Sequence, residues 1–405
     1  MKLLYLAWKS ARARLVPTLL TVLSIAISTA LLLSVEKARI GARAGFAQTV
    51  SGTDLIVGAR SGSVNLLLYS IFRLGDPTAN VSWESYQRFA KRSDVAWTIP
   101  MSLGDSVGDF RVLGTNETYF ERYRYAGKQA LVFREGEPFS GVTDAVLGAN
   151  AARDLGYVIG DGFYISHGLG GTAFAQHKNQ EFTVVGILRP TGTPVDNTIH
   201  ISLGGLEVVH GRPGATASDL TPQSITAFLV GLKSRVAALR YQRDVNTYKA
   251  EPLSAALPGV ALAQLWQIVG TAEQALQIIA YLVVAAGLIG MLTSLLTTLN
   301  ERRREIAVLR AIGARRGDVF FLLVLESTLL SAVGAFIGSL CVQITVVTLS
   351  ETIEATVGIP LGGLRWTALD LYLPLAIAGG GLVLGFLPAI LAYRRTLSDG
   401  LTVQN

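Results

Sequence analysis

Histidine is the side chain whose ordinary pKa suits it to metal binding and proton transfer near neutral pH. The chain has four histidines, His167, His177, His200 and His210. None of them forms the HxxxH or HExxH spacing that places two zinc ligands on one face of a helix. We therefore expect ordinary core or surface histidines and no metal site.

Other patterns that could support catalysis are weak or missing from the sequence. Residues 167–172 read HGLGGT, which has the glycines of a phosphate loop without the strand-to-helix context. The single cysteine, Cys341, lies in an apolar stretch, and no GxSxG or GxxxxGK[ST] motif occurs. We expect no catalytic residue and no cofactor in this chain, so ATP and Mg²⁺ would be bound by a separate polypeptide.

Composition points to a membrane protein. Half of the 405 residues are hydrophobic, only 16% are charged, and the mean hydropathy is +0.43, which argues against an ordinary soluble protein. Stretches long enough to cross a hydrocarbon core of about 30 Å lie at residues 15–35, 275–299, 319–349 and 371–393. The sequence predicts four transmembrane helices. A cleaved signal peptide is the alternative for the first stretch, but its apolar length favours a retained helix.

Charge in the short flanking segments predicts the orientation, because Lys and Arg are retained on the cytoplasmic side. Residues 1–14 carry four basic and no acidic groups, residues 300–318 carry six and three, and residues 394–405 carry two and one. We expect a bacterial inner-membrane protein with both termini in the cytoplasm. Residues 1–14 would form an interfacial amphipathic helix, 300–318 a cytoplasmic coupling helix, 350–370 a short periplasmic loop and 394–405 a tail.

Residues 36–274 then form one large periplasmic segment, long enough for a core of its own. Strand-like runs alternate with helical stretches, which predicts a mixed α/β domain inserted between the first two membrane helices. The strand-like runs are 54–59, 145–148, 162–166, 182–188, 197–203 and 225–232, and the helical stretches are 82–92 and 235–249. Residues 36–50 and 258–274 can extend the spans as helical stalks. The segment has 22 basic and 21 acidic residues, so nucleic acid is not an expected partner.

Two aromatic or apolar runs of this domain have two interpretations each. Residues 119–125, YFERYRY, could line a protein-binding surface or pack in the core. Residues 63–75, SVNLLLYSIFRLG, could grip a partner or a lipid-like cargo, or form a buried helix.

The most informative stretch is NERRREIAVLRAIGARRGDVFFLLVLESTLLSAVGAFIG, residues 300–338. Ile306, Leu309 and Ile312 recur at helical spacing, which predicts a short amphipathic helix beside the membrane. Gly313 provides the helix exit, because glycine adopts a positive φ without a steric penalty. Such a helix, held between two spans, could dock in a groove of another protein.

Here the chain resembles permease subunits of ABC transporters of the FtsX/MacB/LolCE type, also called type VII or mechanotransmission transporters. The resemblance extends along the chain and is most specific over ERRREIAVLRAIGARRGDV and the closing PAILAYRRTLSDGL. It implies a MacB-like periplasmic core domain and contact between residues 301–316 and two copies of a cytoplasmic ABC ATPase. The implied contact residues are Glu301, Arg304, Glu305, Arg310 and Arg316, with Gly313 shaping the turn. From the residues alone, a solvated loop that fixes topology is an equal alternative.

Small and charged residues inside the spans predict how the helices pack. Gly334 and Gly338 in the third span, and Gly381 and Gly385 in the fourth, have the GxxxG spacing that lets helix backbones approach closely. We expect packing within the chain for the fourth span, and either that or dimer packing for the third. Glu326 is an intramembrane carboxylate, which we expect to pair with an interfacial group.

The resulting hypothesis is a permease that works as a homodimer or heterodimer in the lipid bilayer. ATP hydrolysis by a separate ATPase would drive conformational work in the periplasm, most naturally export or extraction of a substrate. A periplasmic adaptor, binding protein or substrate protein would complete the system. Alternatives are a regulator that activates a periplasmic hydrolase or sensor kinase, and a metal or metallophore handling system with a periplasmic binding protein.

Overall fold

The computed structural model describes residues 14–167, 180–210, 220–301, 303–311, 313–357 and 366–395. They divide into two compact units. An α/β unit is built mainly from Ala42–Val269, and a helical unit from the described residues among Met1–Gly41, Gly270–Thr352 and Leu361–Asn405. The predicted interfacial helix 1–14 lies outside the described residues except for Arg14.

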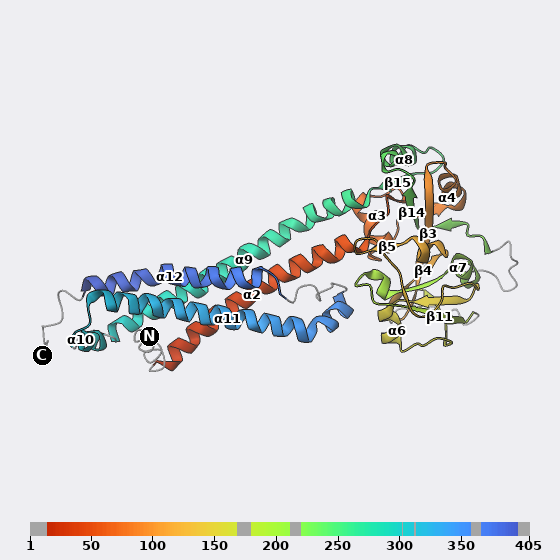
Figure 1. The fold of residues 1–405 in the computed structure, drawn as a ribbon. Helices are drawn as coiled ribbons and strands as arrows, with labels where there is room; N and C mark the ends of the chain where they lie inside the picture. The colour runs from red at the N-terminus through yellow and green to blue at the C-terminus, as the bar shows by residue number, and fades with distance from the viewer. Residues whose placement is uncertain are drawn as a thin grey trace. The chain divides into compact units, whose positions relative to one another are not determined.

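The helical unit contains four long apolar helices that lie side by side (Figure 1). They are α2 (Leu15–Thr49), α9 (Pro258–Glu301), α11 (Arg316–Val357) and α12 (Leu369–Arg395), with the short α10 (Arg303–Ala311) between α9 and α11. Each contains one predicted span and is long and apolar enough to cross a membrane. This confirms the predicted fold class, because the mixed α/β domain is inserted between the first and second of these helices.

All four helices are longer than the apolar stretches that predicted them, and three of them extend well beyond those stretches. The helix α2 continues to Thr49 and α9 begins at Pro258, so both include the residues proposed as stalks. The helix α11 continues to Val357, so residues 350–357 are helical and not part of a loop. Apolarity ends near Leu349, but no Gly or Pro interrupts the sequence before Gly358, which is why hydropathy alone placed the boundary too early.

The glycine pairs face other helices of the same chain. A Cβ on Gly334 would lie 2.8 Å from the Ile25 Cβ, and one on Gly338 would meet the Ala26 carbonyl oxygen, so α11 packs closely on α2. Gly381 and Gly385 likewise lie against the hydroxyls of Ser331 and Ser327, so α12 packs on α11. Both serines are buried and donate to carbonyls of their own helix, which satisfies their hydroxyls without a water molecule.

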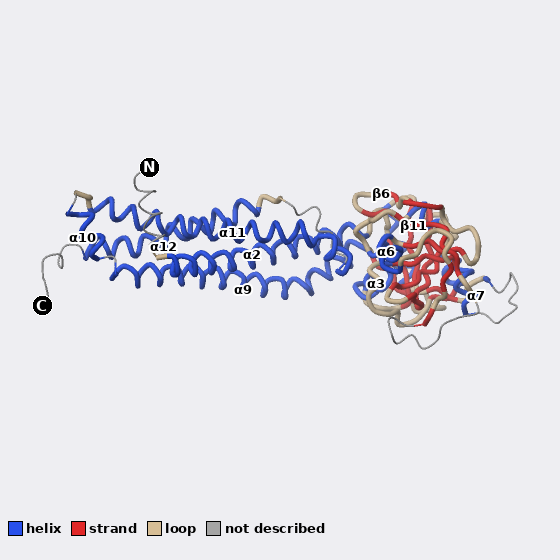
Figure 2. The backbone as a smooth tube through the Cα atoms, turned by 90° about the horizontal axis from the view of Figure 1, so that it is seen from below, coloured by secondary structure: helices blue, strands red, loops and turns tan. Residues whose placement is uncertain are grey.

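The α/β unit is organised around one mixed sheet, whose strands gather in Figure 2 as the red body. Its order among the described residues is β15-β1-β14-β3-β4-β12-β8-β11-β7, with β10 beside β3 and β9 beside β11. The pairs β4–β12 and β8–β11 are parallel, and the other pairs are antiparallel. The main strands are β1 (Leu55–Ala59), β3 (Val95–Val107), β4 (Phe110–Thr115), β7 (Phe133–Gly136), β8 (Asp144–Leu147), β11 (Phe182–Leu188), β12 (Thr198–Ser202), β14 (Ala227–Leu232) and β15 (Leu253–Ala256).

Shorter elements complete this unit. The two-residue strands are β2 (Val81–Ser82), β5 (Arg124–Tyr125), β6 (Gln129–Ala130), β9 (Gly162–Phe163), β10 (Ser166–His167) and β13 (Ser224–Ile225). The helices are α3 (Ser63–Ser70), α4 (Trp83–Ala90), α5 (Thr118–Arg122), α6 (Ala149–Leu155), α7 (Leu203–His210) and α8 (Ala238–Asn246), with 3-10 turns at Pro194–Asn197 and Arg235–Ala237.

Alternation along the strands builds a core on both faces of the sheet. In β1, Leu55 and Val57 pack with α4 and α8, whereas Ile56 packs on the opposite face with Leu66 and Tyr69 of α3. The run 63–75 therefore contains a buried helix. Residues 119–125 are also mainly core, because Tyr119, Phe120 and Tyr123 are all buried.

Most predicted strands form, but the sequence did not indicate β3, the strand that joins the two halves of the sheet. Pro100 and Gly104 interrupt its pattern, and proline lacks the N–H that a central strand normally donates. The register places Pro100 opposite Phe228, and the Thr115 hydroxyl donates to the Pro100 carbonyl at 2.8 Å. Side-chain and tertiary contacts thus hold a strand that local propensity disfavours.

His200 lies inside this core rather than on the surface. It is fully buried in β12, against the rings of Tyr119 and Phe120, and its Nδ1 lies 3.2 Å from the Val146 carbonyl oxygen. Burial, and then the nearby Arg73 cation, lower the pKa of His200 to about 3. The His167 and His210 side chains and all of His177 lie outside the described part of the chain.

Replacing Gly338 by leucine should disrupt the packing of α11 on α2. The added side chain would meet the backbone of α2, and overpacking of this kind costs about 1–3 kcal/mol. Gly379→Leu in α12 is the control, because a Cβ there meets nothing within 4 Å. Thermal unfolding in detergent should show a lower Tm for Gly338→Leu only, and equal Tm values would contradict the packing.

Protonation of His200 should destabilise the α/β unit at acidic pH. Between the unfolded pKa of about 6.5 and the folded pKa of about 3, the unfolded chain binds a proton that the folded chain does not. Stability therefore falls by about 1.4 kcal/mol for each pH unit below 6.5. Denaturant unfolding at pH 7 and pH 5 should show a loss about 2 kcal/mol larger for the wild type than for His200→Leu. Equal losses would contradict this effect.

Candidate functional site

The segment between α9 and α11 has a well-defined turn where α10 ends and α11 begins. The Gly313 N–H donates to the Arg310 carbonyl and the Ala314 N–H donates to the Leu309 carbonyl, which is the pattern of a Schellman helix end. Gly313 has φ +105°, a conformation that disfavours any residue with a Cβ. The next helix starts directly, because the Asp318 carboxylate accepts the Arg315 N–H at 2.7 Å. These contacts define the turn between α10 and α11.

One apolar residue of α10 seats this helix on the bundle. Ile306 packs with Leu299 and Phe320 against a cluster from α11 and α12 that includes Val319 and Ala389. Val308 instead is 61% exposed. The helix therefore has one side packed on its own chain and one side open.

The predicted contact residues of this segment are only partly described. Gly313 forms the turn, Arg310 is half-buried near the end of α10, and Arg316 is exposed at the start of α11. The side chains of Glu301, Arg304 and Glu305 lie outside the described residues. Farther along α11, Glu326 is buried, with 3% exposure.

Four polar residues, which we call the polar clasp, join α2 to α9 and α12. The clasp comprises Glu36, Lys37, Gln277 and Asp370. The Lys37 Nζ lies 2.9 Å from the Asp370 Oδ2, and the two side chains are only 3% and 1% exposed. The Thr367 N–H and hydroxyl donate to the same oxygen at 2.8 and 3.0 Å. Asp370 therefore caps the start of α12 and pairs with α2 at once.

The neighbouring Glu36 connects α2 to α9. Its Oε1 accepts a hydrogen bond from the Gln277 amide at 2.7 Å, and its Oε2 pairs with Arg39 at 2.8 Å. The sequence analysis missed the clasp. The available signal was the position of charges at the edges of two predicted spans, but nothing in the sequence pairs Lys37 with a residue 333 positions away.

The end of α2 is bonded into the α/β unit. Its last carbonyls have no partner within the helix. The Thr49 carbonyl accepts a hydrogen bond from the Tyr123 hydroxyl at 2.6 Å, and the Gln48 carbonyl accepts one from the Ala126 N–H at 2.8 Å. The Ser51 N–H then donates to Arg124 at 3.1 Å. The segment 119–125 thus terminates α2 as well as filling the core.

Aromatic rings fix the start of α9 at the same place. The Phe46 ring of α2 lies 4.4 Å from Phe72 and 5.5 Å from Trp266 of α9, measured between centroids. The Arg43 guanidinium stacks on Trp266 at 5.4 Å. Ala261 of α9 is fully buried in the core cluster that contains Tyr119 and Tyr123. Both helices are therefore anchored in one hydrophobic core.

Removing one partner of the clasp should strongly destabilise the helical unit. Lys37→Met leaves the Asp370 carboxylate buried without its cation, a change that typically costs about 3–5 kcal/mol. The double variant Lys37→Met/Asp370→Leu removes both charges and should recover most of the loss, whereas Lys91→Met, at an exposed lysine, should change nothing. Tm values in detergent measure this. A double variant as unstable as Lys37→Met would contradict the pairing.

Two family models match the chain. One, described as a MacB-like periplasmic core domain, matches residues 18–248, and the other, described as FtsX-like permease C-terminal, matches residues 277–400. The first covers more than half of the chain, and the second begins within α9 and extends past α12.

Individual relatives are distant. A macrolide export ATP-binding/permease protein MacB of Photorhabdus laumondii is 24% identical, covering 96% of this chain and 59% of the relative. An uncharacterized ABC transporter permease of Methanocaldococcus jannaschii is 26% identical, covering 44% of this chain and 43% of the relative. The extracellular domain of the ABC-type transporter YknZ from Gram-positive bacteria matches with TM-score 0.32 and 12% identity, covering 51% of this chain and 98% of that one.

The chain spans at most 59% of the length of these two curated relatives. Nevertheless, the two family models together match most of the α/β unit and most of the four long helices. The chain belongs to the FtsX- and MacB-like family of ABC transporter permeases.

Proposed function

We propose that this permease couples ATP hydrolysis by a separate ABC ATPase to conformational work by its α/β domain. One observation carries the proposal: α2 and α9 are unbroken helices whose residues belong to both the helical and the α/β unit. At 1.5 Å per residue they measure about 52 and 66 Å, well beyond the roughly 30 Å of a hydrocarbon core. A rigid helix that is anchored in the domain can transmit a displacement across the membrane.

The proposed path begins at residues 301–316. Two copies of the ATPase, holding ATP and Mg²⁺, would bind the open side of α10 together with Glu301, Arg304, Glu305, Arg310 and Arg316. Because Gly313 and Asp318 fix the turn between α10 and α11, a push on α10 would move α11 with it. Leu299 of α9 and Ile306 of α10 pack on the same apolar cluster, so α9 would move too. The polar clasp would pass part of this motion to α2 and α12.

The positive charge of the segments 1–14, 300–318 and 394–405 supports an orientation with these segments in the cytoplasm. The α/β domain would then work in the periplasm of a bacterial cell, with the helices in the inner membrane. Export or extraction of a substrate fits best, since relatives are named as macrolide export proteins. A second permease protomer and a periplasmic adaptor or substrate protein would complete the assembly.

Reversing two charges of the coupling segment should separate the permease from its ATPase. Glu305→Arg/Arg310→Glu should lower the amount of ATPase that copurifies with the permease by roughly tenfold, a loss of about 1.4 kcal/mol in binding. Arg394→Glu, at an exposed arginine in the last inner segment, is the control and should copurify normally. Quantitative immunoblotting of detergent-purified complexes measures the ratio. Full copurification with the double variant, in protein that is inserted normally, would contradict the assignment.

A further inference from the structure

One exposed face of the α/β unit combines apolar and basic side chains. We call it the α8 patch: Arg235, Val236, Leu239, Arg240 and Arg243, from the turn at Arg235–Ala237 and the helix α8. Val236 is 89% exposed and Leu239 is 70% exposed, and all three arginines are exposed too. The apolar residues that attach α8 to the sheet lie on the other side of the helix, where Ala238, Tyr241 and Val245 are buried.

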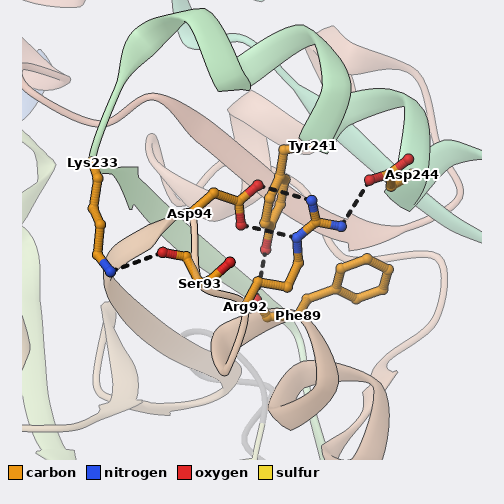
Figure 3. A network of polar contacts seen from close by, with 7 residues as sticks. All are labelled: Phe89, Arg92, Ser93, Asp94, Lys233, Tyr241 and Asp244. Carbon is orange, nitrogen blue, oxygen red and sulfur yellow. Dashed lines mark hydrogen bonds and ion pairs between the residues drawn. The ribbon is translucent and has the colours of Figure 1, made fainter.

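A network of polar contacts attaches the helix that carries the patch to the rest of the unit (Figure 3). The Arg92 guanidinium bonds to both Asp94 oxygens, at 3.0 and 2.8 Å, and to Asp244 of α8 at 2.8 Å, while it stacks on Tyr241. The Tyr241 hydroxyl donates to the Phe89 carbonyl. The hydrogen bonds from Arg92 keep the pKa of Asp94 below its usual range, so the network stays charged at neutral pH. A rigid surface loses little entropy when it binds.

The same network leaves the patch with an excess of positive charge. Asp94 and Asp244 are already paired with Arg92. Arg235 reaches Asp54 only at 3.9 Å and is 77% exposed, and within the described part of the chain Arg240 and Arg243 form no ion pair. Two exposed arginines that form no ion pair within the described residues thus flank two apolar side chains on the outward side of one helix.

We propose that the α8 patch docks an acidic amphipathic segment of a partner protein. Its carboxylates would pair with Arg240 and Arg243, and its apolar side chains would cover Val236 and Leu239. Arginine suits this role because its planar guanidinium binds carboxylates at two points. This docking site does not depend on the ATPase contact.

The geometry favours a protein over an anionic lipid surface. A helix that lies in a membrane interface buries a continuous apolar face. The apolar face of α8 is already used against the sheet, and only Val236 and Leu239 remain outside. Two such side chains between arginines match a short groove or helix of a protein better than a bilayer.

The test is site-specific photo-cross-linking of the full-length permease in its native cells. A benzophenone amino acid replaces Leu239, and cross-linked peptides are sequenced by mass spectrometry. We expect an adduct with a segment rich in Asp or Glu and in apolar residues. Arg240→Gln/Arg243→Gln should lower its yield roughly tenfold, or about 1.4 kcal/mol. Hydrogen exchange of α8 in this variant should match the wild type, because both arginines are exposed and unpaired within the described structure.

The matched control places the benzophenone at Val158, which is 58% exposed, with Arg153→Gln as its charge variant. The benzophenone at position 158 should not give the acidic adduct, and Arg153→Gln should not change the yield of the adduct at position 239. The proposal is overturned if position 239 gives no adduct, or gives one to lipid, to a second copy of the permease or to a segment without acidic residues. An adduct whose yield does not depend on Arg240 and Arg243 would also overturn it.

Discussion

Hydrocarbon offers no hydrogen-bond partners, so a backbone that crosses it must satisfy its own amides. This constraint makes α2, α9, α11 and α12 unbroken helices, and it makes each helix a stiff element. Beyond their apolar stretches, the ends of two of these helices have other partners. The last carbonyls of α2 accept Tyr123 and Ala126, and α9 starts beside Trp266 in the same core. The end of α2 and the start of α9 therefore belong to the α/β unit, so these two helices are continuous with the domain that they would move.

The helical unit depends on small and polar contacts rather than on hydrophobicity, because lipid competes for every apolar surface. Gly338 lets α11 approach α2, and Gly381 and Gly385 let α12 approach α11. The polar clasp adds charged contacts that are specific in partner and geometry. A buried ion pair contributes little net stability, but it penalises any arrangement that separates the two charges. The clasp would thus hold α2, α9 and α12 together at one point, about which they could tilt relative to one another.

The sequence predicted elements whose signal is local. Apolar length identified the four long helices, and alternation identified strands such as β11 at Phe182–Leu188. The sequence did not predict features that depend on contacts between residues far apart in the chain. Pro100 disfavours β3, which its neighbours in the sheet hold in place, and His200 is buried by rings that its own strand does not supply. Lys37 and Asp370 form an ion pair although they are 333 positions apart, so no local sequence pattern could predict this contact. Between α10 and α11, the sequence placed Gly313 correctly in a turn, because its conformational requirement is local.

The central claim is that ATP binding to the partner ATPase moves the α/β domain relative to the membrane helices. Spin labels at Ala47, on the exposed side of α2, and at Trp366, just before α12, report this movement in a Cys341→Ala background. Pulsed electron resonance gives their distance distribution with and without ATP, with a hydrolysis-deficient ATPase bound. The account predicts a shifted mean distance with ATP, and no shift when Glu305 and Arg310 are reversed. Identical distributions with and without ATP would contradict it.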